Sequence, residues 1–343
     1  MHSSVGLSVT AESSGQHSEF PLNSALILGV TGQDGITLSK YLCDLGYEVI
    51  GTSRDPNAFS RSPRSRFLDN RVRLVPLDFR DPAYLTALFR ELKPSEIYNL
   101  AGLTSVAESF ADPIKSFESI VLCTSKILNG VRHGSPDSRF FNACSSECFG
   151  GVTTKQAANE DTPFRPSSPY AIAKADVFWQ VRIHREAYSM FACSGILGNH
   201  ESVMRADHFV TKKIVRAAVE IKRGHREFLE LGNISISRDW GWAEDYVQCM
   251  HAMLNATSAA DYVIATGTNH TLIQFLQRTF SHLGLDWETH VRVSQSEMRP
   301  LDVVKTSLDP SRVKRELGWS SRTSFEEIVE KMIEFELGRD AIL

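Results

Sequence analysis

The sequence predicts an α/β protein built on a doubly wound parallel sheet, with a smaller, interleaved α/β domain. Residues 25–28 form an apolar run that leads into a glycine-rich turn and then into apolar residues at helical spacing. Short apolar segments and helical segments then alternate through the first half of the chain. A length of 343 residues, 42% of them hydrophobic, allows about two domains with a large core.

The turn after the first strand carries glycines at every third position. This spacing lets the backbone approach a pyrophosphate at the positive end of a helix. Such a turn also serves simple helix packing, but its place between a strand and a helix favours a dinucleotide site of the Rossmann type. The predicted cofactor-binding turn consists of Gly29, Thr31, Gly32, Gln33, Asp34 and Gly35.

Further strands are expected at 46–51, 73–78, 96–100 and 139–143, with helices at 84–91 and around 117–127. The carboxyl ends of parallel strands meet at one edge of the sheet, where ligands bind. Cofactor contacts are therefore expected at Asp78, Phe79, Leu100 and Ala101, and chemistry at Ser145 and Glu147. A late strand is expected at 261–267 and a closing helix at 324–337.

The end of the second strand selects between the two nicotinamide dinucleotides. An acidic residue there binds a ribose diol, whereas an arginine pairs with a 2′-phosphate. Arg54 comes first and Asp55 follows, so the sequence favours NADP over NAD. The alternative is that Arg54 is a solvated loop residue.

Pro169 suits the first turn of a helix capped by Ser167 or Ser168, which places Tyr170 and Lys174 one turn apart on the same face. A lysine charge about 5 Å from the phenol is worth roughly 3 kcal/mol, about two pKa units, in favour of the phenolate. A Y-x-x-x-K spacing also occurs by chance on surface helices. Ser145 supports the chemical interpretation because it can share a hydrogen bond with the same substrate hydroxyl.

The net charge of −4, with both signs mixed along the chain, argues against nucleic-acid binding. No apolar run approaches the roughly 18 residues of a membrane span. Six cysteines without regular spacing indicate reduced thiols, a cytoplasmic location and no metal site. Residues 1–23 are expected to be a disordered extension, 24–195 an NADP-binding domain with returns near 239–267, and 196–343 mainly a substrate domain.

Several motifs carry a family resemblance over residues 25–333. They are the turn at 29–35, Tyr98-Asn99-Leu100, Ser145-Ser146-Glu147, Pro169-Tyr170 with Lys174, Asn199-His200-Glu201-Ser202, Phe209-Val210-Thr211, Leu231-Gly232-Asn233, Arg238-Asp239-Trp240-Gly241 and Arg299-Pro300. With them the chain resembles the extended short-chain dehydrogenase/reductase (NAD-dependent epimerase/dehydratase) family, and within it the GDP-mannose 4,6-dehydratases.

The resemblance implies a lyase that oxidises C4 of a hexose with NADP, eliminates water across C5 and C6, and then reduces C6. Tyr170 would be the base for the 4-hydroxyl, assisted by Ser145 and Lys174, and Glu147 would take the C5 proton. A plain dehydrogenase has no need of Glu147, whose alternative role is to cap the following turn.

The resemblance also implies a GDP-sugar substrate, with Ser105, Asn199, Lys213, Arg238 and Arg299 among its contacts. His200 and Arg205 match positions that touch the cofactor, and the resemblance implies that Arg205 does so across a subunit contact in a homodimer or homotetramer. Gly198 stands where the family has phenylalanine, which predicts a wider pocket floor. Two other functions stay open: a 4-keto nucleotide-sugar reductase or epimerase, and a non-catalytic nucleotide-binding protein.

Overall fold

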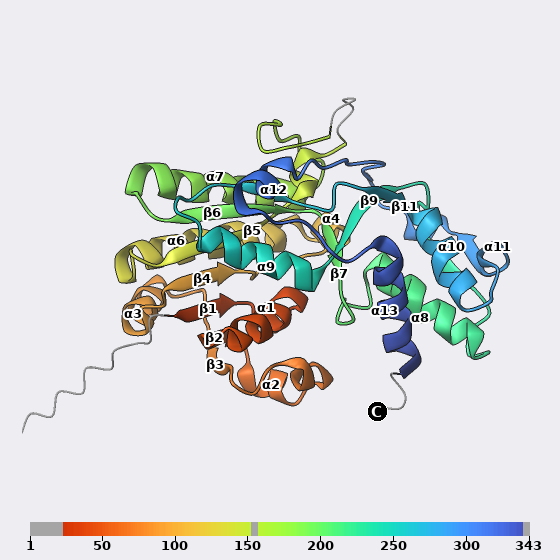
Figure 1. Cartoon of the computed structure of the whole chain (residues 1–343), viewed down its shortest axis with the longest axis horizontal. Helices are drawn as coiled ribbons and strands as arrows, with labels where there is room; N and C mark the ends of the chain where they lie inside the picture. The colour runs from red at the N-terminus through yellow and green to blue at the C-terminus, as the bar shows by residue number, and fades with distance from the viewer. Residues whose placement is uncertain (1–22, 152–156, 339–343) are drawn as a thin grey trace, which may run out of the picture.

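The computed structural model describes residues 23–151 and 157–338, so the expected extension at 1–23 lies, but for Asn23, outside the described residues. Seven parallel strands form the main sheet in the order β10-β6-β5-β4-β1-β2-β3 (Figure 1). This order confirms the doubly wound sheet that the sequence predicts. The strands are β1 (Ser24–Leu28), β2 (Glu48–Ser53), β3 (Arg73–Pro76), β4 (Glu96–Asn99), β5 (Arg139–Ser145), β6 (Ala192–Leu197) and β10 (Tyr262–Ile264).

The central strands are buried along nearly their whole length because helices cover both faces of the sheet. All five residues of β1 are buried, and Leu26 is in register with Ile50 on β2 and Ile97 on β4. β3 ends two residues earlier than predicted, at Pro76. A proline has no N–H for the ladder, and β3 is the edge strand, where such a residue is tolerated.

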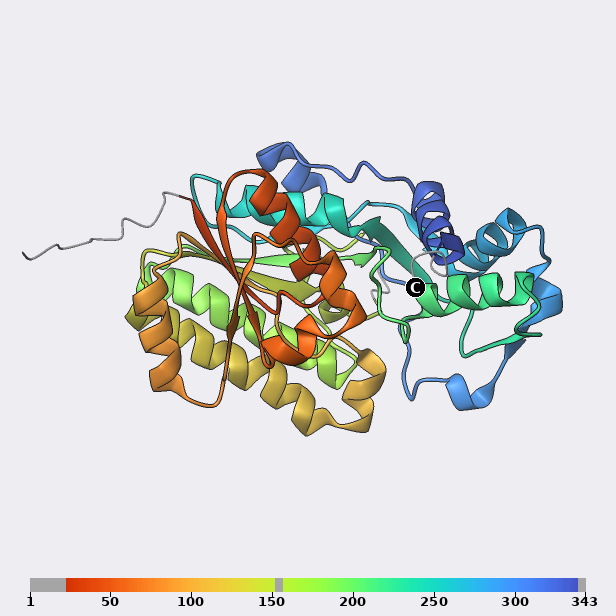
Figure 2. The same ribbon diagram turned by 90° about the horizontal axis from the view of Figure 1, so that it is seen from below.

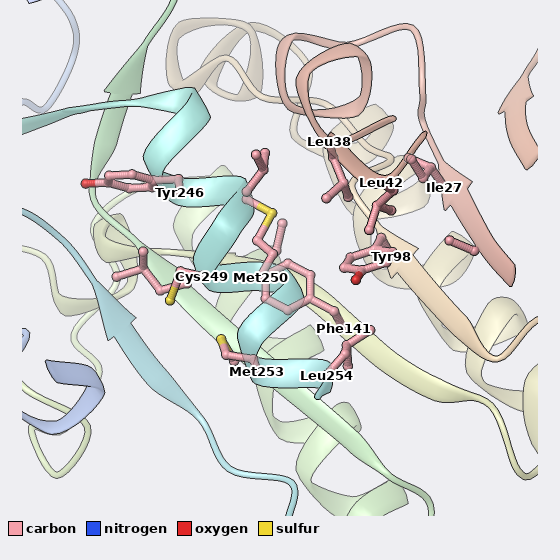
Figure 3. Packing of buried hydrophobic residues seen from close by; sticks show 14 of the residues in the cluster. Ile27, Leu38, Leu42, Tyr98, Phe141, Tyr246, Cys249, Met250, Met253 and Leu254 are labelled. Carbon is pink, nitrogen blue, oxygen red and sulfur yellow. The ribbon is translucent and has the colours of Figure 1, made fainter. Parts of the chain in front are cut away.

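One face of the sheet is covered by α1 (Gln33–Asp44) and α9 (Ala243–Leu254), and the other by α3 (Pro82–Leu92), α6 (Cys123–Gly134) and α7 (Pro169–Tyr188) (Figure 2). Figure 3 shows the first of these layers, where Leu38 of α1 and Met250 of α9 pack with Tyr98 and Phe141 of the sheet. The chain thus returns to the main sheet late, through α9 and β10.

The connection between β4 and β5 contains more breaks than its apolar spacing predicts. It holds α4 (Val106–Ala111) and α5 (Pro113–Phe117), then a π-helical turn, η2 (Glu118–Leu122), that runs directly into α6. Asp112 ends α4 and caps α5 by accepting a hydrogen bond from the Lys115 N–H. The remaining short elements of this half are α2 (Pro56–Ser60), η1 (Pro63–Phe67) and η3 (Ser146–Phe149).

A smaller lobe lies beyond the carboxyl ends of the strands (Figures 1 and 2). Its core includes Trp240, Phe275 and Phe325. In both lobes, none of the helices within 23–151 and 157–338 is long and apolar enough to cross a membrane. The helices of the smaller lobe are α8 (Val210–Lys222), α10 (Leu272–His282), α11 (Trp287–His290) and α13 (Phe325–Gly338), with η4 (Gln295–Glu297) and α12 (Ser311–Leu317) on the connections. Its strands are β7 (Asn199–Glu201), β9 (Ser237–Trp242) and β11 (Asn269–Thr271) in one sheet and β8 (Leu229–Leu231) and β12 (Val291–Val293) in another.

Candidate active site

A single cavity at the carboxyl edge of the main sheet collects most of the predicted site residues. β4, β5, β6 and α7 supply one wall, and the segment from β7 to α8 and β9 supply the other. The predicted residues that line it are Asp34, Leu100, Ser105, Ser145, Glu147, Tyr170, Lys174, Asn199, His200, Arg205, Arg238 and Arg299. Those outside its lining are Gly29, Thr31, Gly32, Gln33, Gly35, Arg54, Asp78, Phe79, Ala101 and Lys213.

The glycine turn has the close-packed backbone that a dinucleotide site requires. Gly29 has a φ of +86°, and a Cβ there would lie 3.0 Å from the Ala101 backbone. A Cβ on Gly35 would lie 2.5 Å from the Gly29 carbonyl oxygen, and the Gly32 N–H donates to this same oxygen at 3.1 Å. Backbone N–H groups at the start of α1 are therefore free of side-chain bulk, and the turn fits a bound pyrophosphate.

The other predicted cofactor contacts lie farther out along the sheet. Arg54 and Asp78 are exposed beyond the ends of β2 and β3, and the Asp78 carboxylate binds Arg80 at 2.6 Å. Phe79 is partly buried and packs against the hydrophobic core between the sheet and helices α3, α6 and α7. Lys213 is separate from the cavity and pairs with Glu297 at 2.7 Å.

Tyr170 opens α7 as expected, because Ser168 caps this helix by accepting a hydrogen bond from the Ala171 N–H at 3.1 Å. The phenol is almost fully buried. Burial raises the pKa of Tyr170, and a hydrogen bond with the Ser145 hydroxyl lowers it in part. Ser145 at the carboxyl end of β5 and Tyr170 at the start of α7 thus line the same cavity, as a proton-transfer pair requires.

Lys174 differs from the expectation. Its ammonium donates to the Ala143 carbonyl at 2.8 Å and lies 5.9 Å from the centre of the Tyr170 ring, and burial lowers the pKa of Lys174. The sequence predicts that the Lys174 ammonium lies close to the phenolic oxygen of Tyr170 and lowers its pKa. In the structure burial dominates the pKa of the phenol instead, because helix α7 brings the whole pair under the sheet edge.

Glu147 lies in η3, directly after β5. The cap of this turn is the Ser145 hydroxyl, which accepts a hydrogen bond from the Glu147 N–H at 3.3 Å. The Glu147 carboxylate therefore does not cap this turn, and its Oε1 lies 3.6 Å from Nε of Arg238. This geometry disfavours the capping role and places a carboxylate in the same cavity as Tyr170.

Asp34 and His200 join the cofactor turn to the opposite wall. His200 Nε2 lies 3.0 Å from both carboxylate oxygens of Asp34, and Nδ1 lies 2.9 Å from the Gly198 carbonyl oxygen. Burial works to raise the pKa of Asp34, but the charge and hydrogen bonds of His200 outweigh it and lower this pKa to about 2. Burial likewise opposes protonation of His200, and Asp34 reverses the effect and raises the pKa of the imidazole.

Replacing His200 with Asn is expected to reduce the free energy of unfolding by about 2 kcal/mol near pH 5.5. The raised pKa of His200 contributes stability below its ordinary value of 6.5, and this contribution is lost as the pH rises through the raised pKa. The lowered pKa of Asp34 contributes stability above 3.8 that is lost as the pH falls towards 2. Denaturant unfolding should therefore show that His200→Asn loses most free energy of unfolding near pH 5.5 and less at both higher and lower pH. The exposed His225→Asn is the control and should show no such dependence. A loss that stays constant above pH 6.5 would contradict the ion pair.

Gly198 does not widen the pocket as expected. A Cβ on Gly198 would lie 3.2 Å from the Tyr246 hydroxyl oxygen and 3.2 Å from Leu308, neither of which lines the cavity. The missing side chain would therefore point into packed core, and the expectation of a wider floor was wrong.

Sequence reasoning gave no role to Thr104, His208, Phe209, Thr211 and Trp240, which also line the cavity. Phe209, Thr211 and Trp240 lie within the quoted motifs, which is the signal that could have identified them. The guanidinium of Arg205 lies 3.6 Å from the centre of the Phe209 ring and pairs with Glu201 at 3.0 Å.

Within the described parts of the chain, no group of three His, Cys, Asp or Glu side chains could hold a metal ion. The Sγ atoms of buried Cys144 and Cys148 are 3.7 Å apart.

Residues 26–332 match the family model described as GDP-mannose 4,6 dehydratase. The chain belongs to this family. GDP-mannose 4,6 dehydratase 2 of Arabidopsis thaliana is 39% identical to this family member over 341 residues, which cover 96% of this chain and 91% of the relative. The GDP-mannose 4,6 dehydratase of Homo sapiens is 36% identical over 340 residues and covers 91% of each chain.

Solved structures of other enzymes share the fold of this GDP-mannose 4,6-dehydratase family member. UDP-glucose 4-epimerase of Thermotoga maritima gives a TM-score of 0.81 at 20% identity, covering 93% of this chain and 100% of the other. DesIV, a dTDP-glucose 4,6-dehydratase of Streptomyces venezuelae solved with NAD, gives 0.80 at 23% identity, covering 92% and 97%. RMD from Pseudomonas aeruginosa, solved with NADPH, gives 0.76 at 20% identity, covering 92% and 99%.

Proposed function

We propose that this protein converts GDP-mannose to GDP-4-keto-6-deoxymannose, with a nicotinamide dinucleotide as resident cofactor. Family membership makes the protein a nucleotide-sugar 4,6-dehydratase, a hydro-lyase. The single observation that carries the reaction is that Glu147 lines the same cavity as Ser145, Tyr170 and Lys174. A carboxylate beside a Tyr-Ser pair supplies the second base that dehydration needs and simple oxidation does not.

Tyr170 takes the proton of the C4 hydroxyl, and Ser145 shares a hydrogen bond with the same oxygen. Held at the glycine turn, a nicotinamide dinucleotide would supply the acceptor for the hydride from C4 and the donor for its return to C6. Oxidation at C4 acidifies the C5 proton, which Glu147 removes as the C6 hydroxyl leaves. Glu147 gives that proton to the departing hydroxyl, which leaves as water. When C6 is then reduced, C5 takes up one proton, which balances in number the proton that Tyr170 removed from the C4 hydroxyl.

The cofactor is proposed to be NADP. The glycine turn supports a dinucleotide, and the RMD and DesIV structures of the same fold were solved with NADPH and NAD. Arg54, exposed at the end of β2, supports a 2′-phosphate ligand. Lys174 on α7 and His200 on β7 face the cavity and are proposed to contact the bound cofactor.

The GDP portion is proposed to lie towards the smaller lobe, along Asn199, Arg238 and Arg299. Two arginines with planar, fixed donors suit a diphosphate. Lys213 would reach the nucleotide only after leaving Glu297.

A homodimer or homotetramer in the cytoplasm is the proposed state. Ile172, Trp179 and Ile183 on α7 are each about half exposed, at 54%, 50% and 54%. α7 packs against α5 and η2, which expose Ile114, Phe117 and Leu122. A continuous apolar face of this kind supports pairing of two copies.

Incubating the purified protein with GDP-mannose and NADP is expected to give a product lighter by one water, with no net change in reduced nicotinamide absorbance. Mass spectrometry of the nucleotide sugar and the absorbance trace check both parts. Net oxidation of added NADPH with a 4-keto nucleotide sugar would instead identify a reductase. Unchanged substrate in the presence of bound NADP would contradict the proposed substrate.

A further inference from the structure

A carboxylate outside the cavity lining, Asp302, lies in a line of alternating charges that runs from Glu147 to Arg299. Glu147 pairs with Arg238, Arg238 with Asp302, and Asp302 with Arg299. Asp302 Oδ1 lies 3.4 Å from Nη2 of Arg238 and 3.6 Å from Nη1 of Arg299. Both arginines line the cavity, whereas Asp302, with a side chain 16% exposed, lies behind them.

The Arg238 guanidinium is fixed by backbone on its other side. Its Nη1 donates to the Val303 carbonyl at 2.6 Å and to the Ser237 carbonyl at 3.0 Å, and its side chain is 6% exposed. The Ser237 N–H also donates to the Val304 carbonyl at 2.8 Å, so the segment that carries Asp302 is bound along β9. Nη2 of Arg238 donates to Asp302 Oδ1 at 3.4 Å, and because a guanidinium is planar with its donors in fixed directions, the carbonyl and Asp302 contacts together determine where Nε points.

Nε of Arg238 points to Glu147, at 3.6 Å from Oε1. This ion pair with Arg238 is the contact that orients the Glu147 carboxylate. A shift of Arg238 therefore moves the carboxylate. A misplacement of about 1 Å in a reacting group can cost about 10²-fold in rate.

We propose that Asp302 is a positioning residue that holds Arg238 against Glu147 and so aims the carboxylate at C5 of the substrate. The proposal rests on the proposed dehydratase function. A positioning role differs from a role in which Asp302 only neutralises the arginine charges at the diphosphate site. If Asp302 only neutralised charge, its loss would change the affinity for the substrate. If it positions Glu147, its loss slows only the proton removal that Glu147 performs.

The test is Asp302→Asn, which keeps the shape of the side chain and removes its charge. We expect kcat to fall on the order of 10²-fold with little change in KM. Reduced nicotinamide should accumulate on the enzyme during turnover, because oxidation at C4 still proceeds. The deuterium isotope effect on kcat from C5-labelled GDP-mannose should rise, because proton removal at C5 becomes rate-limiting.

Asp309→Asn is the matched control, because Asp309 belongs to the same segment and bonds the Ser311 N–H at the start of α12. It should leave all three readouts unchanged. A rise in KM for Asp302→Asn without accumulation and with an unchanged C5 isotope effect would overturn the proposal. Should Asp302→Asn not fold, Arg238→Lys carries the same test, because lysine keeps the charge but cannot bond the carbonyls and both carboxylates together. Failure of the proposed function is distinct, since the unaltered protein would then form no product.

Discussion

Glu147→Gln is expected to lower the rate of dehydration of GDP-mannose by at least about 10³-fold, within the range for loss of a general acid–base group. The amide keeps the shape of the carboxylate but cannot accept the C5 proton. Oxidation at C4 depends on Tyr170 and Ser145, which the substitution leaves in place. Reduced nicotinamide should therefore appear in about one equivalent per active site and persist, as measured by rapid-mixing absorbance and by the mass of the trapped sugar.

Glu91→Gln on the exposed face of α3 is the control for that experiment and should dehydrate GDP-mannose at the unaltered rate. Undiminished dehydration by Glu147→Gln would remove the carboxylate from the mechanism. Loss of dehydration without reduced nicotinamide would mean that Glu147 acts before C5, for example in binding the substrate.

Tyr170→Phe is expected to lower turnover by about 10²-fold to 10⁴-fold and to leave no reduced nicotinamide at any time. Phenylalanine keeps the packing of the nearly buried ring at the start of α7, so the protein should fold and bind NADP. The proton of the C4 hydroxyl then has no acceptor, and the reaction stops before its first step. Stopped-flow absorbance and a binding titration with NADP measure the two parts.

Tyr188→Phe, at the exposed end of the same helix, is the matched control and should retain full turnover. Reduced nicotinamide formed by Tyr170→Phe at the unaltered rate would show that another group takes the first proton. The two variants, at Glu147 and at Tyr170, thus stop the reaction on opposite sides of C4 oxidation.

Much of the fold was readable from local sequence. The Pro169 and Ser168 pair predicted the first turn of α7, and the apolar runs at 96–100 and 139–143 predicted β4 and β5 to within two residues. Helices covering both faces make such strands rich in apolar residues, which is a strong signal. The break at η2 had no such signal, because its apolar residues keep the spacing of a helix.

The site was readable as a set of residues, and its contacts were not. Asp34 and His200 are 166 positions apart in the sequence, and no local pattern places one imidazole between a cofactor turn and the Gly198 carbonyl. The orientation of Lys174 towards Ala143 depends on how α7 lies under β5. The glutamate partner of Lys213 likewise comes from a distant turn that the sequence pattern did not mark.

The late return of the chain through α9 and β10 has a consequence for how such proteins diverge. The two lobes are built from alternating segments of the chain, so neither lobe is a contiguous segment that recombination could transfer to a different protein. A cut anywhere between β6 and α9 would take Met250 and its neighbours away from α1 and strip an edge strand from the main sheet. New substrate preferences must therefore arise by point changes within a shared framework rather than by exchange of whole modules.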